Sequence, residues 1–152
     1  MTTEMRRAGP ADVVAIKTLV DEAYGKWIPL IGRKPWPMTV DYAVAVTEHD
    51  IQLLHVNGVL AGLVETIRAA DFVVENLAVS PDFQKQGLGD ALLRQSEQTA
   101  ASLGYDAIKL YTNQRFAENI AFYERRDYRI ESQEQLADGV LINLIKKLPS
   151  PG

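Results

Sequence analysis

The order of apolar and polar positions divides the chain into short strands and amphipathic helices. Asn57-Gly58 stands between two apolar runs, which predicts a β-hairpin, and a second hairpin is predicted around Asp138-Gly139. Strands are predicted at residues 5–7, 51–56, 59–66, 72–79, 106–111, 128–133 and 140–146, and helices from Pro10 to near Gly25 and at residues 39–47, 90–103 and 116–126. This order predicts a mixed α/β fold around one twisted sheet, in which strand 106–111 returns parallel to strand 72–79.

Two helix ends carry residues typical of caps. Thr39 is the expected N-cap of helix 39–47, with Asp41 in its first turn. Gly104 is the expected C′ residue after helix 90–103.

Between the first two helices, residues 26–38 contain three prolines and a glycine, which exclude a long regular element. Both tryptophans of the protein lie in this segment, where they either pack on the core or line a pocket.

The stretch from Val73 to Leu93 combines a buried strand, a Ser-Pro turn, a glycine-rich loop and the start of a helix. A helix N-terminus presents free backbone N–H groups that bind phosphate, and glycine lets the backbone approach a ligand closely. The dinucleotide-binding fingerprint is excluded because Leu92 stands where its third small residue belongs, and the Gly-Lys-Ser/Thr of a P-loop is absent. What remains is Gln84-x-x-Gly87-x-Gly89.

Length, net charge and residue types limit the classes of partner and chemistry that are expected for this protein. At 152 residues the chain is expected to form one domain over residues 1–148, followed by a tail at 149–152. Its formal net charge of −4 argues against nucleic acid and anionic membranes as partners. The absence of cysteine excludes disulfides and thiolate chemistry, and His49 and His55, interpreted as structural, are too few for most metal sites. No apolar run is long enough to span a membrane, so a cytoplasmic protein is expected.

Three segments resemble the GNAT superfamily of acetyl-CoA-dependent N-acetyltransferases. The first is the Gln84-x-x-Gly87-x-Gly89 loop, and the second is Asn119-Ile-Ala-Phe-Tyr123-Glu. The third, Gly-Arg-Lys-Pro-Trp-Pro-Met at residues 32–38 with Asp-Tyr at 41–42, is similar to a bacterial subgroup whose substrates are mostly unassigned. The resemblance implies a GNAT-like acyl-CoA N-acyltransferase fold, an α/β fold with a central twisted, mostly antiparallel sheet and helices on both faces. It also implies acetyl-CoA as the cofactor and a homodimer, which is common in the family.

The sequence departs from the family pattern at two positions. Asp127 stands where a glycine is usual, but aspartate tolerates the left-handed conformation better than most residues, so the turn is expected to survive. Many relatives place an asparagine seven residues before the tyrosine, where this chain has Phe116. The cofactor contact is therefore carried over to Asn119, which lies one helical turn from Tyr123 on the same face.

By resemblance, the cofactor lies along the loop and the strand before it. The pyrophosphate would be held by the backbone N–H groups of the loop, namely Gln84, Lys85, Gln86, Gly87, Leu88, Gly89 and Asp90. The pantetheine arm would pair with the strand backbone at Leu77, Ala78 and Val79. An N–H group near Leu77 would hold the thioester oxygen as negative charge develops on it.

Two residues are candidates for acid and base. Tyr123 would protonate the leaving sulfur, since a phenol titrates near ~10 and a thiol near ~8.5; the alternative is that Tyr123 only packs beneath the sheet. Glu75 would accept the proton of the amine. Strand alternation places Glu75 on one face with Val73, Leu77 and Val79, so it either lines the cleft or is turned to solvent by a bulge near Asn76.

The acceptor pocket is expected to draw on the proline-rich segment and on neighbouring strands. Its candidate residues are Tyr24, Trp27, Ile31, Arg33, Trp36, Met38, Tyr42, Glu75, Tyr111 and Asn113. Aromatic residues with one arginine suit an amine next to an apolar or carboxylate-bearing group. We therefore expect acetyl transfer to a small-molecule or peptide amine. A non-catalytic acyl-CoA-binding sensor is the alternative, and an enzyme acting on charged tRNA is disfavoured by the acidic balance.

Overall fold

The computed structural model describes residues 2–149, so of the expected tail only Pro149 is described. The strands are β1 (Thr3–Arg7), β2 (Asp50–Val56), β3 (Val59–Arg68), β4 (Phe72–Val79), β5 (Ala107–Asn113), β6 (Arg129–Leu136) and β7 (Gly139–Lys147). The helices are α1 (Val13–Tyr24), α2 (Ile28–Ile31), α3 (Tyr42–Glu48), α4 (Leu88–Ser102) and α5 (Ala117–Glu124). The predicted strands and the longer helices are all present, with ends shifted by a few residues.

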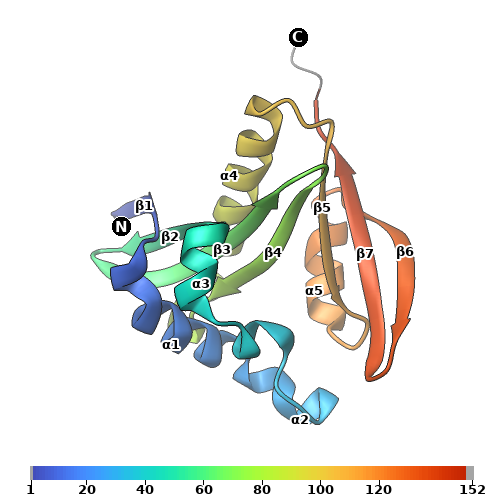
Figure 1. Ribbon diagram of the computed structural model, residues 1–152, viewed down its shortest axis with the longest axis horizontal. Helices are drawn as coiled ribbons and strands as arrows, with labels where there is room; N and C mark the ends of the chain where they lie inside the picture. Colours follow the sequence, from blue (N-terminus) through green and yellow to red (C-terminus); the bar gives the residue numbers. More distant parts are fainter. Residues whose placement is uncertain (1, 150–152) are drawn as a thin grey trace.

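All described strands belong to one sheet, in the order β1-β2-β3-β4-β5-β7-β6. Its neighbours are antiparallel except β4 and β5, which are parallel and joined by the crossover through α4. Figure 1 shows that β4 and β5 meet at one end and diverge toward the other. The predicted mixed, mostly antiparallel sheet is therefore confirmed.

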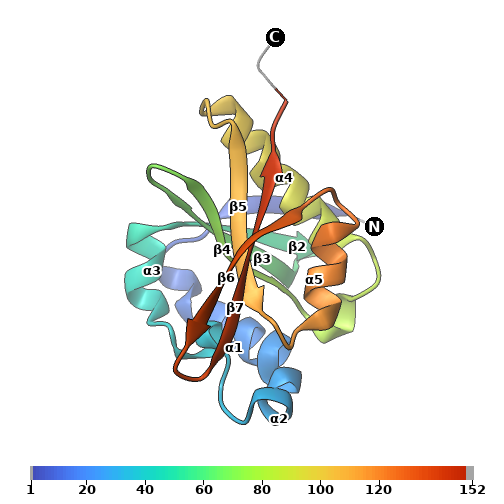
Figure 2. The ribbon, with the colours of Figure 1, turned by 90° about the vertical axis from the view of Figure 1, so that its right-hand side faces the viewer.

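Helices cover both faces of the sheet. Two apolar clusters form the core: one buries residues of α4 and α5 against the strands, and the other buries residues of α1 and α3 against the opposite face. Figure 2 shows α3 on one side of the sheet and α4 and α5 on the other. Gly62 on β3 permits close packing of α4, because a Cβ atom there would stand 3.0 Å from a Leu92 methyl group and from the Ala78 carbonyl oxygen.

The local signals at turns and caps account for most element ends. Asn57 and Gly58 both have positive φ, 50° and 82°, as the predicted hairpin turn requires. Gly104 has φ 91° after α4, which confirms it as the residue that ends this helix. The expected N-cap at Thr39 is wrong. Asp41 caps α3 by accepting a hydrogen bond from the Ala43 N–H, because its carboxylate is a better acceptor and stands directly before the helix.

Candidate active site

β4 carries a β-bulge at Glu75. In the register of β3 and β4, Glu65 pairs with Asn76 and Thr66 pairs with Val74, which leaves Glu75 without a partner. A bulge bends its strand and increases the local twist. The pairing of β4 with β5 also ends at Val74, so the bulge marks the point where these two strands part.

The bulge changes which side chains share a face of β4. Val74 belongs to the core cluster beneath α4, and Leu77, three positions later, packs against the same cluster. The expected alternation, which grouped Glu75 with Val73, Leu77 and Val79, is therefore wrong across this point. Side chains of a strand alternate between its two faces, and the extra residue of a bulge reverses this alternation for the residues that follow.

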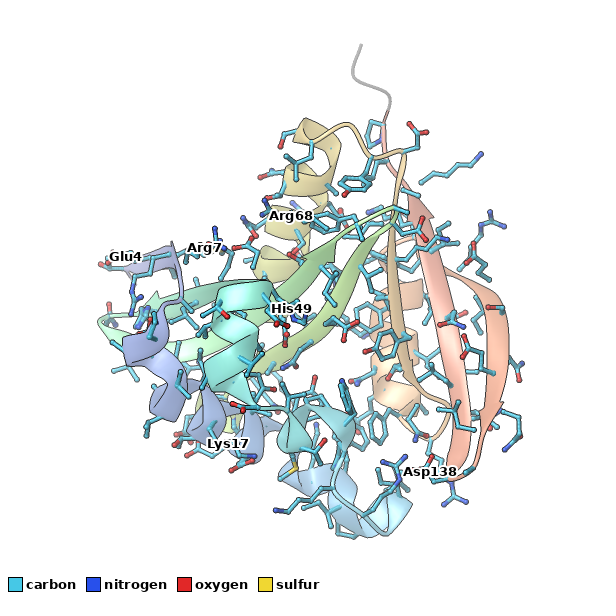
Figure 3. The ribbon with its side chains drawn as sticks, in the orientation of Figure 1. Glu4, Arg7, Lys17, His49, Arg68 and Asp138 are labelled. Carbon is cyan, nitrogen blue, oxygen red and sulfur yellow. The ribbon has the colours of Figure 1, made fainter. Side chains whose placement is uncertain are left out.

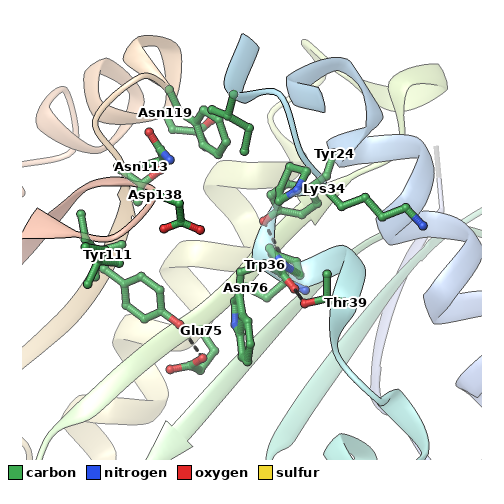
Figure 4. Close-up of a pocket in the computed structure, with 18 of the residues that line it drawn as sticks. Tyr24, Lys34, Trp36, Thr39, Glu75, Asn76, Tyr111, Asn113, Asn119 and Asp138 are labelled. Carbon is green, nitrogen blue, oxygen red and sulfur yellow. Dashed lines mark hydrogen bonds between the residues drawn. The ribbon is translucent and has the colours of Figure 1, made fainter. Parts of the chain in front are cut away.

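A cavity of about 730 Å³ lies in the space between the diverging strands. It is lined by β4, β5, α5, the segment that joins α1 to α3, and the turn between β6 and β7. This volume falls within the range of small-molecule sites. The close-up in Figure 4 shows side chains from these elements converging on it.

Beyond the bulge, the edge of β4 that faces β5 pairs with no strand among residues 2–149. Leu77 lines the cavity, Val79 is half-buried against the α4 side, and Ala78 is buried in the cluster on the α1 side. The Leu77 carbonyl accepts a hydrogen bond from the Tyr24 hydroxyl at 3.1 Å. A free strand edge of this kind is what an extended amide chain such as pantetheine can pair with.

The glycine-rich loop forms an open cradle at the start of α4. Lys85 and Gly87 both have left-handed φ, 64° and 79°, and no atom lies within 4 Å of where a Gly87 Cβ would stand. The helix begins at Leu88, two residues earlier than expected, and no side chain caps it. Its first N–H groups therefore remain available, as a phosphate site needs. Asp90 does not block them, because its carboxylate is engaged by Arg126 at 2.8 Å.

Asn119 and Tyr123 both line the cavity from α5, as their spacing of four predicts. Tyr123 is only 8% exposed and its ring packs edge-on against Tyr128, at 5.7 Å between centroids. Its hydroxyl makes no hydrogen bond to any other residue within 2–149. Burial raises the pKa of Tyr123, so the phenol stays protonated at neutral pH. Asp127 follows this helix with φ 70°, which confirms that aspartate replaces the usual glycine without loss of the turn.

Glu75 meets Tyr111 across the gap between the strands. The Tyr111 hydroxyl donates a hydrogen bond of 2.6 Å to Glu75 Oε2 (Figure 4). Burial, followed by this bond to a carboxylate, raises the pKa of Tyr111, so it remains a donor. Both side chains line the cavity. Glu75 therefore lines the cleft, as the first alternative for it expected, although the bulge of the second alternative is also present.

The other expected acceptor residues divide into two groups. Those that line the cavity are Tyr24, Ile31, Arg33, Trp36 and Asn113. Those that do not are Trp27, Met38 and Tyr42, which are all buried. Trp27 stacks on Phe116 at 4.4 Å between ring centroids, so it supports the cavity wall from behind. The Tyr42 hydroxyl donates to the Pro37 carbonyl at 2.6 Å, which anchors the proline-rich segment.

Sequence reasoning missed Asn76, a buried residue of the cavity wall. Its Oδ1 accepts a hydrogen bond from Tyr24 at 2.7 Å, and its Nδ2 donates to the Tyr42 hydroxyl at 3.1 Å. These bonds fasten β4 to α1 and α3 just beyond the bulge. An asparagine within a predicted strand was a usable signal, because asparagine is depleted in strands and usually marks a special position.

Glu65 and His49 form a pair that the sequence did not predict, and Figure 3 shows His49 beside α3. The His49 Nδ1 atom lies 2.7 Å from Glu65 Oε2, and Glu65 is 3% exposed. Burial raises the pKa of Glu65, although the contact with His49 acts against this. The expected structural role of His49 agrees with its position outside the cavity lining.

Asp138, also unpredicted, lies at the turn between β6 and β7 (Figure 3), and its carboxylate points into the cavity (Figure 4). Arg33 Nε lies 3.0 Å from Asp138 Oδ2, so this ion pair joins the proline-rich segment to the β6–β7 turn.

Among residues 2–149, no group of three or more His, Cys, Asp or Glu side chains is placed to hold a metal ion. In the same part of the chain, no helix has both the length and the apolar character needed to cross a membrane.

A sheet that opens beside a glycine loop, with a cavity between the parted strands, has the shape of a site for an extended cofactor that carries phosphate. A family model for the acetyltransferase (GNAT) domain matches residues 41–130, more than half of the chain. The protein therefore belongs to the GNAT acetyltransferase family, as its sequence indicated. Acetyl-CoA is the acyl donor of this family, and the loop and strand edge described above fit it.

Solved structures share the fold over nearly the whole chain. The PaiA N-acetyltransferase from Thermoplasma acidophilum, in complex with coenzyme A, has a TM-score of 0.82, 15% identity, and coverage of 97% of this chain and 99% of its own. For the ribosomal-protein-S18-alanine N-acetyltransferase from Escherichia coli, the TM-score is 0.80, the identity 21%, and the coverage 99% and 97%. For the IAA acetyltransferase from Bacillus cereus, the TM-score is 0.74, the identity is 18%, and the coverage is 97% of this chain and 100% of its own. A search of curated proteins gave no match. At these identities the likeness establishes the fold alone.

Proposed function

We propose that this protein transfers the acetyl group of acetyl-CoA to a primary amine, which attacks the thioester directly. One observation supports this most strongly: Tyr123 and the Glu75–Tyr111 pair line the same cavity, where β4 and β5 part. A proton donor and a proton acceptor thus face one space that the cofactor-binding edge of β4 also borders. This is the arrangement that acyl transfer between a thioester and an amine needs.

Acetyl-CoA would be held by two parts of the chain. The backbone N–H groups of Gln84 to Asp90 would bind the pyrophosphate, and the free edge of β4 at Leu77, Ala78 and Val79 would pair with the pantetheine arm. Asn119 would contact the arm from α5. When bound, acetyl-CoA supplies an acetyl group activated as a thioester.

Tyr123 would donate its proton to the sulfur as the carbon–sulfur bond breaks. Its hydroxyl is free to do so, because it makes no hydrogen bond to another residue of the described chain. Burial raises the pKa of Tyr123 above that of an ordinary phenol, so the mismatch with a thiol near ~8.5 is larger than the sequence indicated. We therefore expect Tyr123 to give up the proton late, once negative charge has developed on sulfur.

Glu75 would accept the proton that the amine loses as its nitrogen bonds to the acetyl carbon. A free amine titrates near ~10, so at neutral pH it needs a base. Tyr111 donates to Glu75 Oε2 at 2.6 Å, which leaves Oε1 for the amine and fixes the orientation of the carboxylate. Tyr111 is thus a positioning residue for Glu75.

Thiol release from acetyl-CoA across a panel of amines tests this function. Glu75→Gln should lower kcat about 100-fold or more, and Tyr111→Phe by a smaller factor, with the Kd for CoA unchanged in both variants. Binding of CoA with no thiol release by the wild type for any amine would instead support the non-catalytic acyl-CoA sensor.

The cytoplasmic location and the homodimer expected from the sequence stay predictions, as does the single domain over residues 1–148.

A further inference from the structure

A second cavity, of about 360 Å³, adjoins the first on its acceptor side. Ile31, Asn113, Asp138, Gly139 and Val140 line both cavities, and Gln114 and Arg115 line only the second. The two spaces are therefore parts of one site. It extends from Glu75, between the strands, to the gap between α2, the β5–α5 connection and the β6–β7 turn.

The charges in this site are not evenly distributed. Glu75 is the carboxylate at the inner end, where Tyr111 is its hydrogen-bond donor. At the outer end stand two guanidinium groups, Arg33 in the first cavity and Arg115 in the second, with Asp138 as the one carboxylate among the residues lining that end. Lys34 also lines the first cavity, but its ammonium points away from it (Figure 4). The inner end is therefore negative and the outer end has an excess of positive charge.

The guanidinium groups of the outer end have unused donors. Arg33 Nε is buried, and although Asp138 Oδ2 lies 3.0 Å away, no described acceptor meets it with hydrogen-bond geometry. Arg115 donates one bond, to the Leu30 carbonyl at 3.1 Å, and forms no ion pair with a carboxylate among residues 2–149. A buried donor without an acceptor is costly, so a ligand oxygen at this place would be favoured.

We infer that the acceptor is a small amine that also carries a carboxylate group. Its amine would lie at Glu75, and its carboxylate at Arg33 and Arg115, because guanidinium groups bind carboxylates through paired hydrogen bonds. This inference rests on the proposed function and names the substrate class of the same site. A polycationic amine fits less well, since its distal charge would meet two arginines.

Matched pairs of acceptors test the inference: β-alanine, 4-aminobutyrate and 6-aminohexanoate, each against its own carboxamide, with spermidine as the polycation. Thiol release should give a kcat/KM that favours the carboxylate member of at least one pair by ~10-fold to 100-fold. Arg33→Gln and Arg115→Gln should each raise KM for the carboxylate member and bring the ratio toward one. Arg129→Gln, which changes an exposed arginine of β6 outside both cavities, should leave the ratio unchanged.

The outcomes separate this inference from the function on which it rests. Equal turnover of both members of every pair would overturn the carboxylate assignment but leave amine acetylation standing. A preference that survives both arginine substitutions, or a preference for spermidine that Asp138→Asn abolishes, would also overturn it. If no amine releases thiol although CoA binds, the proposed function and this inference fail together.

Discussion

Tyr123→Phe separates catalysis from folding at the candidate site. The substitution removes one oxygen that makes no hydrogen bond within the described chain, and phenylalanine keeps the ring contacts with Phe122 and Tyr128. Without a lost internal bond, the free energy of unfolding should change by less than about 0.5 kcal/mol. The loss of proton donation to the leaving sulfur should lower kcat ~10-fold to 1,000-fold, equivalent to about 1.4–4 kcal/mol in activation free energy.

Tyr128→Phe is the matched control, because the two tyrosines pack against each other but have different hydroxyl partners. The Tyr128 hydroxyl donates to Glu97 Oε2 at 2.8 Å, and Tyr128 does not line the cavity. Hydrogen bonds to charged groups contribute about 1.5–3 kcal/mol. Lys146, 3.1 Å from Glu97, compensates in part. We therefore expect the loss in stability to be at the lower end of this range, about 1.5 kcal/mol. This corresponds to a Tm decrease of roughly 3–6 °C, and kcat should be unchanged.

Three measurements decide between the two roles of Tyr123: kcat from thiol release, Kd for CoA by calorimetry, and Tm by scanning calorimetry. The proposed role requires kcat to fall in Tyr123→Phe while Kd and Tm stay within error of the wild type. If kcat is unchanged, Tyr123 is not the acid. If Kd and Tm change together with kcat, Tyr123 is a packing residue, and the alternative considered from the sequence is correct.

Further predictions concern single backbone and surface positions. Gly87→Val should weaken CoA binding at least about 10-fold in calorimetry, since a side chain at this open position obstructs the loop. Gly58→Val is the control, because Gly58 has a similar φ of +82° and equally open surroundings. Both substitutions should lower the free energy of unfolding by roughly 1–2 kcal/mol, but Gly58→Val should leave the Kd for CoA unchanged. Asp127→Gly should raise Tm by about 1–4 °C, because glycine accepts φ 70° without strain; a lower Tm would contradict this. The hydrogen bond from Arg6 lowers the pKa of Asp12 to about 2, so this carboxylate stabilises the fold above pH 4 and ceases to do so as the pH falls through about 2. Asp12→Asn should therefore lose about 1 kcal/mol at pH 7 in urea unfolding, and equal stability at pH 7 would refute the assignment.

The local geometry of the candidate cofactor site could be predicted from the sequence because it depends on short segments. Gly87 needs a left-handed φ, the loop must precede a helix, and Asn119 and Tyr123 need only a helical spacing of four. Each of these requirements spans a few residues, so the sequence states it directly. The acceptor half is assembled from distant segments, and no local pattern could place Asp138 beside Arg33, more than a hundred residues earlier in the chain.

Aromatic residues of the proline-rich segment illustrate the same limit. Trp27 and Trp36 are nine residues apart and equally apolar, yet Trp36 is 57% exposed and lines the cavity while Trp27 is buried behind it. The difference depends on the ring of Phe116, which Trp27 stacks on and which comes from a distant part of the sequence. Composition alone identifies both as candidates and cannot separate them.

The bulge at Glu75 explains why one strand serves both halves of the site. Before the bulge, β4 pairs with β5 and is closed to any ligand; beyond it, the strand has turned away and its edge is free. The same extra residue brings Glu75 to Tyr111 of β5, while Asn76 is fastened to Tyr24 on the other face. In a regular strand, the pairing with β5 would continue past Val74 and close the edge to which we assign the cofactor. The position of the bulge therefore fixes the candidate base and the proposed cofactor-binding edge together, and deleting Glu75 should abolish CoA binding as well as turnover.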